Sequence, residues 1–83
     1  MPNVNFAFGP LILDGYFAAD GDADASPNYY GFVRADGAWY ILKETLSAGA
    51  DTYKYAKGDS RYEANWTNRA NLTYDYYHNV FGE

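Results

Sequence analysis

Residues 29–43 read YYGFVRADGAWYILK, and this stretch decides the fold. Two apolar runs flank the short polar sequence at 35–38. Its central Asp36-Gly37 pair is typical of a two-residue type I′ turn, in which both residues take positive φ angles. The stretch therefore predicts an antiparallel β-hairpin with Asp36 and Gly37 as its loop.

That loop sets a register in which Arg34 pairs with Trp39. Directly paired residues share a face of the sheet. One predicted face carries Val33, Tyr40 and Leu42, and the other carries Tyr30, Phe32, Arg34, Trp39, Ile41 and Lys43. Both faces are partly apolar, so we expect both to be covered. Arg34 would also lie against Trp39 in a cation–π contact.

The flanking segments extend this sheet. Residues 52–57 alternate as a third strand, with Tyr53 and Tyr55 on one face. Residues 3–13 alternate around a Gly-Pro break, which predicts an N-terminal strand that either completes the chain's own sheet or adds to a neighbour's edge. Residues 18–28 are small and polar, and they predict a loop.

The C-terminal part has two possible patterns. Ser60 and Glu63 have capping-box spacing, and Thr67 is a good N-cap for a helix over about 67–80. Leu72, Tyr74 and Tyr76 alternate instead, as in a final strand. We favour the helix.

The predicted fold is α+β and mainly β, with a small antiparallel sheet around the Asp-Gly hairpin and one C-terminal helix. We expect a single domain: residues 1–28 as an N-terminal arm and acidic loop, and residues 29–83 as the β-rich body.

Composition argues against several function classes. The chain has 83 residues, a net charge of -5 and no Cys. The acidic balance disfavours nucleic acid as a partner, because no basic patch neutralises phosphates. No apolar run approaches the length of a membrane span, and no secretory signal is visible. Without thiolates, a disulfide or zinc staple is not expected, which leaves oligomerisation as the support for so short a chain.

Residues that would carry chemistry are few. Asp20, Asp22 and Asp24 have the spacing of a calcium loop, but Ala25 and Gly31 stand where an EF-hand needs Gly and Glu. We therefore expect a solvated acidic loop and no metal or other cofactor, although cation binding stays open. His78 is the only imidazole and has no nucleophile motif around it. We expect a protein that is not an enzyme.

Aromatic residues are the compositional excess, with 10 Tyr and 2 Trp. Such rings suit interfaces because each has an apolar body and a polar tip. The predicted contact residues are Phe6, Phe8, Tyr29, Tyr30, Trp39, Tyr53, Tyr55 and Trp66. The alternative is a carbohydrate-binding module in which sugars stack on an aromatic platform.

Residues 39–44, 53–58 and 65–74 together give the chain a resemblance to small, mostly uncharacterised proteins of tailed bacteriophages. The resemblance covers about residues 29–81 and contains no catalytic motif. It implies a minor virion component that is made in the host cytoplasm and contacts copies of itself or a larger virion protein. We therefore expect a structural or assembly protein.

Overall fold

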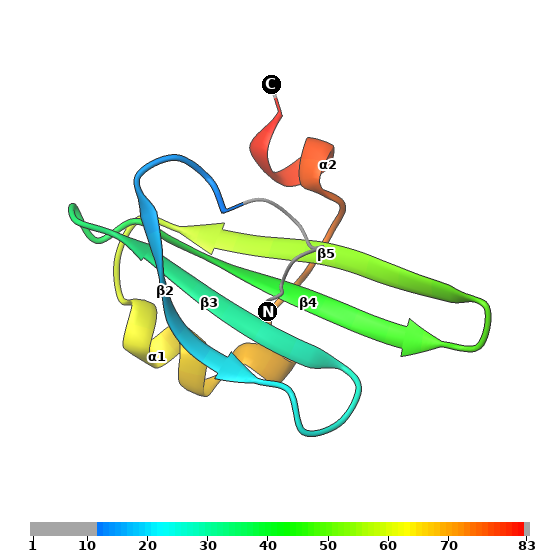
Figure 1. The fold of residues 1–83 in the computed structure, drawn as a ribbon. Helices are drawn as coiled ribbons and strands as arrows, with labels where there is room; N and C mark the ends of the chain where they lie inside the picture. Colours follow the sequence, from blue (N-terminus) through cyan, green and yellow to red (C-terminus); the bar gives the residue numbers. More distant parts are fainter. Residues whose placement is uncertain (1–11, 83) are drawn as a thin grey trace.

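The computed structural model describes residues 12–82, which form an antiparallel sheet followed by short helices. Four strands come first (Figure 1): β2 (Tyr16–Asp22), β3 (Asn28–Arg34), β4 (Trp39–Ser47) and β5 (Ala50–Gly58). The α-helices α1 (Tyr62–Thr67) and α2 (Tyr77–Phe81) follow, separated by the 3₁₀ turn η1 (Arg69–Asn71). The predicted strand at 3–13 lies almost wholly outside the described residues, as do Phe6 and Phe8.

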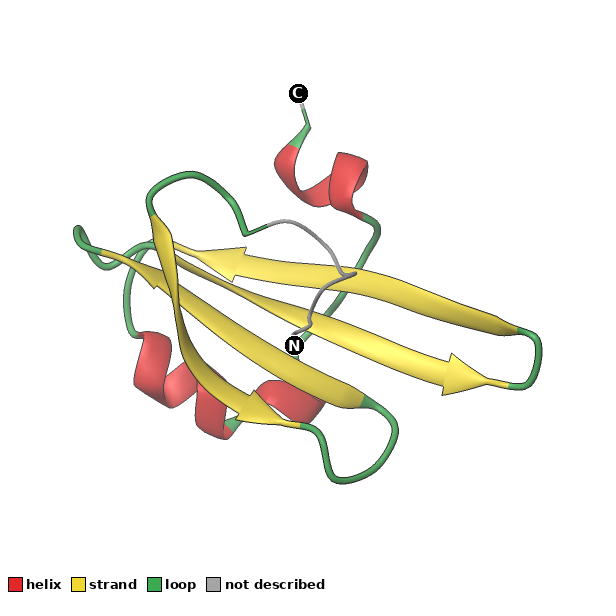
Figure 2. Cartoon of the chain, in the orientation of Figure 1, coloured by secondary structure: helices red, strands yellow, loops and turns green. Residues whose placement is uncertain are grey.

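The strands are ordered β2-β3-β4-β5, so each pairs with its neighbours in sequence. Figure 2 shows this meander, with β2 at one edge of the sheet. The prediction of a small, mainly β antiparallel fold is confirmed at this level.

The predicted register between β3 and β4 is wrong by one residue. Arg34 N–H donates to the Ala38 carbonyl (2.8 Å) and Gly37 N–H to the Arg34 carbonyl (2.9 Å), so the loop has three residues, 35–37. Gly37 has φ +97°, as the last residue of such loops often requires. Asp36 supports the loop by accepting the Ala38 N–H at 3.1 Å.

This change of register moves every β4 side chain to the opposite face relative to β3, because strand side chains alternate with a period of two. Trp39 pairs with Val33, and Tyr40 pairs with Phe32. Arg34 consequently lies over the ring of Tyr16, 5.2 Å from its centroid, and the predicted contact with Trp39 does not form.

Each face of the sheet has its own apolar cluster. The α1 face carries Tyr29, Trp39, Ile41, Ala56 and Tyr62, with Val33, Trp66, Leu72 and Tyr74 packed around them. The α2 face carries Phe32, Tyr40, Leu42 and Tyr55, with Leu13, Tyr16, Tyr30, Tyr53, Val80 and Phe81 around them. The prediction that both faces are covered is confirmed.

A single helix over 67–80 does not form. Thr67 ends α1 instead of capping a helix, and α1 follows Arg61, whose φ is 64° and whose side chain makes no cap. Asp75 instead exchanges two backbone hydrogen bonds with Tyr55, at 2.7 and 3.0 Å. This bridge to β5 interrupts the helical period, and the alternative of a final strand is reduced to one bridged residue.

The predicted loop at 18–28 is wrong at its two ends, and residues 23–27 form a loop as predicted. The strand β2 includes residues 18–22, the first five residues of the predicted loop, and β3 begins at Asn28, the last residue of that loop. The small and acidic residues that suggested a loop tolerate a strand here because β2 is an edge strand, in which residues 17–21 stay exposed.

Tyrosine burial predicts that the fold is lost at high pH. Burial raises the pKa of Tyr40 to about 12, and it also raises the pKa of Tyr55 and Tyr74. Unfolded tyrosines ionise near pH 10. Their contribution to stability is therefore complete below about pH 10 and disappears as pH rises through about 12.

We expect tyrosinate absorbance and far-ultraviolet circular dichroism to change together in this range. Tyr40→Phe, which removes one ionising group, should move the midpoint to higher pH. Tyrosines that all ionise near pH 10 while the dichroism stays native would contradict the prediction.

Candidate functional site

The predicted contact residues separate into two groups. Tyr29, Trp39 and Tyr55 are 7%, 4% and 8% exposed, so they belong to the core of the chain itself. Tyr30, Tyr53 and Trp66 are partly buried around the two clusters. The described part of the chain therefore does not bring the predicted residues together into one outer surface.

The acidic residues of the predicted loop are used to hold β2 against α1. Asp20 and Asp22 project from β2 onto the α1 face. The Tyr62 hydroxyl donates to Asp20 Oδ2 at 2.8 Å. Burial and this carboxylate both raise the pKa of Tyr62. The Arg69 guanidinium forms an ion pair with Asp22 at 2.8 Å.

Arg69 connects this edge to the aromatic cluster. Its guanidinium lies 4.4 Å from the Trp66 ring centroid and 5.8 Å from that of Tyr29. It also donates to the Trp66 carbonyl at 2.8 Å. No local motif indicated this role, because Asp22 and Arg69 are 47 positions apart and only the fold brings them together.

β2 is an outer strand of the described sheet. Within residues 12–82 no strand pairs with its outer edge, since β2 ends the sheet order. Phe17, near the start of β2, is 75% exposed, the highest value among the exposed large apolar side chains of residues 12–82. It pairs with Val33 and therefore lies on the α1 face. Large aromatic side chains in such positions mark interaction sites when they border further apolar surface.

A cavity of about 470 Å³ lies on this same face, between the edge of the sheet and the start of α1. It is lined by Ala19, Asp20, Val33, Gly37, Arg61, Tyr62 and Glu63. Val33 lines the cavity and is also the β3 partner of Phe17. The edge of β2, Phe17 and this cavity form one continuous candidate site, which we call the β2 site.

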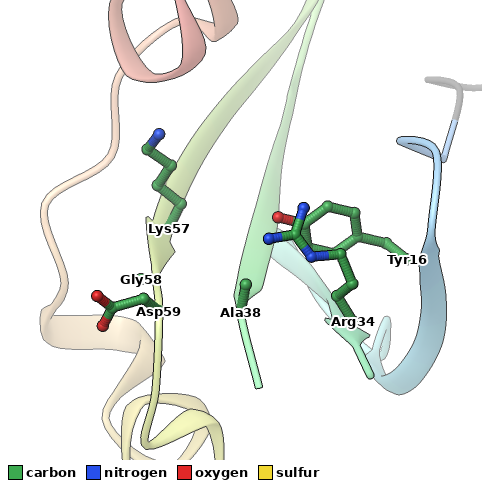
Figure 3. A pocket seen from close by; sticks show the side chains of 6 residues that line it. All are labelled: Tyr16, Arg34, Ala38, Lys57, Gly58 and Asp59. Atoms are coloured by element: carbon green, nitrogen blue, oxygen red, sulfur yellow. The ribbon is translucent and has the colours of Figure 1, made fainter. Parts of the chain in front are cut away.

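A second cavity, of about 540 Å³, lies where β5 ends (Figure 3). Its two cations already have partners in the chain. Arg34 pairs with Asp36 at 2.9 Å, and Figure 3 shows its side chain against the Tyr16 ring. Lys57 lies over the Phe81 ring, 5.1 Å from its centroid. Both cations of this cavity are therefore already engaged within the chain.

Other candidate chemistry is dispersed. His78 in α2 stacks on Tyr76, with their ring centroids 6.5 Å apart. In the described part of the chain, no three His, Asp or Glu side chains gather in a way that would hold a metal ion. The same residues contain no helix with the length and apolar character needed to cross a membrane.

Comparison with protein-family models, curated proteins and solved structures finds no match for this chain.

Proposed function

We propose that this chain is a non-enzymatic assembly protein that contacts another protein through the β2 site. The observation that carries the proposal is the exposure of Phe17 on an unpaired edge strand, beside a cavity on the same face. An edge strand presents a row of backbone N–H and C=O groups that can pair with another chain. Addition of a strand to such an edge is a common mode of protein recognition.

The energetic argument concerns Phe17. Burial of a phenylalanine side chain contributes about 1.5–3 kcal/mol. In the isolated chain this contribution is largely unused, because the ring is 75% exposed. A partner that covers the Phe17 ring would gain this free energy on binding.

The proposed setting is a bacteriophage virion, in which the chain is a small subunit made in the host cytoplasm. The resemblance of residues 29–81 to small phage proteins is the ground for this setting. The partner is then a larger virion protein or a copy of the chain.

A carbohydrate-binding module is the alternative, and the structure favours it less. Four of the rings that a sugar platform would use, Tyr29, Trp39, Tyr40 and Tyr55, are buried. Asp20 and Asp22 already bind Tyr62 and Arg69. Their carboxylates are therefore less available to sugar hydroxyls.

Site-specific photocrosslinking tests the proposal. Phe17→p-benzoylphenylalanine would be produced in the cell that naturally makes the protein, and the assembled material would be irradiated. We expect a covalent protein adduct at position 17. The same label at Ala48, in the exposed turn between β4 and β5, should give little adduct.

The mass of the adduct distinguishes the partners. Twice the mass of the chain would mean contact between copies, and a larger mass would mean a different protein. Equal adducts at both positions, or none at position 17, would contradict docking at the β2 site.

A further inference from the structure

We propose that the β2 site binds an extended, positively charged segment of a different protein, which adds to β2 as a strand and places one basic side chain in the cavity. This inference rests on the proposed function and specifies its partner. It follows from three properties of the site: its open edge, the position of the cavity and its charge.

The open edge sets the conformation of the partner. The outer backbone groups of β2 can be satisfied by an extended chain about 4.8 Å away, the usual spacing of paired strands. Along β2 the residues from 17 to 21 are exposed, so the edge is accessible over most of its length.

The cavity sets where a partner side chain goes. In an added strand, every second side chain projects to the α1 face. The cavity opens on that face and is lined by Ala19 and Asp20 of β2 itself. A side chain from the added strand therefore reaches the cavity directly, in the way that pockets beside a sheet edge select alternate residues of a bound peptide.

The charge of the cavity selects a basic side chain. Asp20 and Glu63 contribute two carboxylates, and Arg61 contributes one guanidinium. Asp20 Oδ2 already accepts the Tyr62 hydroxyl, so a cationic head would approach Glu63 and the other oxygen of Asp20. Val33 and the Tyr62 ring supply apolar walls. A lysine or arginine has an apolar stem for these walls and a cationic head for the carboxylates. The net charge of -5 favours the approach of such a segment over longer distances.

A second copy of β2 is a poor occupant of the same edge. The strand contains Asp20 and Asp22 and no basic residue. Antiparallel pairing of two copies would bring these like charges together, which destabilises a sheet.

Binding of synthetic peptides to the purified full chain tests the inference. The probe is a fluorescent, end-capped peptide of sequence Thr-Lys-Val-Lys-Thr-Lys-Val, and the matched probe has Glu in place of each Lys. We expect the lysine peptide to bind at least about tenfold more tightly, a difference of about 1.4 kcal/mol. The lysine peptide would also be N-methylated at every second backbone nitrogen, in either of the two alternating sets. Only one set of N–H groups faces β2, so methylation of that set should abolish binding and methylation of the other set should spare it.

Two protein variants locate the binding. Ala19 is exposed and lines the cavity, so neither a lysine nor a glutamate there should unfold the chain. Ala19→Lys should weaken the lysine peptide about tenfold, and Ala19→Glu should bind it at least as tightly as the unmodified protein. Circular dichroism would check that both variants are folded.

Equal binding of the two peptides, equal effects of the two methylation sets, or no binding at all would overturn the inference. A crosslink from position 17 to a second copy of the chain would also overturn it, while leaving the assembly function intact. Loss of all crosslinks at position 17 would instead remove the proposed function itself.

Discussion

Gly31→Ala is expected to destabilise the chain by about 2–3 kcal/mol, the upper range for overpacking a core. A Cβ at this position would coincide with the Tyr62 hydroxyl and lie 2.9 Å from Tyr62 Cζ. Tyr62 would have to move out of the α1-face cluster and lose its hydrogen bond to Asp20. Chemical denaturation monitored by circular dichroism would measure the change.

Two variants test this cause. Gly21→Ala is the matched control, because its Cβ would meet only Tyr30 at 3.8 Å, an ordinary contact, and stability should change little. Combining Gly31→Ala with Tyr62→Phe removes the hydroxyl and should recover part of the loss. Equal destabilisation by the two glycine substitutions would show that the space occupied by Tyr62 is not the reason.

Trp39→Ala is expected to cost about 3–5 kcal/mol, as truncation of a buried tryptophan usually does. The indole is 4% exposed, and its Nε1–H donates to the Ser60 carbonyl at 2.7 Å. A chain of 83 residues has about 4–12 kcal/mol of total stability at typical values per residue. We therefore expect the variant to unfold at much lower denaturant concentration or to lose its cooperative transition.

Trp39→Phe separates packing from hydrogen bonding. It keeps most of the ring contacts but leaves the Ser60 carbonyl without its donor, which should cost about 1–3 kcal/mol. Unchanged stability in Trp39→Ala would mean that this ring is not a core residue and would return it to the list of contact residues.

The general architecture was predictable because strand periodicity survives in this sequence. The apolar runs at 29–34 and 39–43 correspond to β3 and the first half of β4, and residues 52–57 lie within β5. The register was not predictable from the Asp-Gly pair alone. Asp-Gly also occurs in three-residue loops, and the choice between the loops depends on hydrogen bonds such as the one from Ala38 N–H to Asp36.

The ends of the sheet were harder to predict because tertiary contacts decide them. The acidic residues of β2 suggested a loop, and their partners Tyr62 and Arg69 are more than forty positions away. Apolar residues beyond Thr67 do recur at helical spacing, but the backbone bridge from Asp75 to Tyr55 prevents one continuous helix there.

The candidate site shows the same limit. A tyrosine-rich composition indicates that aromatic surface exists, but not which rings are outside. Trp39 and Tyr55 are buried, whereas Phe17, which no motif marked, is the most exposed large apolar side chain within the part of the chain that the structure describes. Its position follows from β2 being the last strand of the sheet, a property of topology that local sequence does not express.

The backbone hydrogen bonds between Asp75 and Tyr55 affect how many further strands can add to this sheet. They occupy the middle of the β5 edge, so an incoming strand there must first displace the chain's own tail. The β2 edge has no such competitor among residues 12–82. Among residues 12–82, the β2 edge is therefore the one to which a strand can add without displacing another part of the chain. Strand addition at these two edges would therefore end a sheet at this unit and would not continue it from one copy to the next.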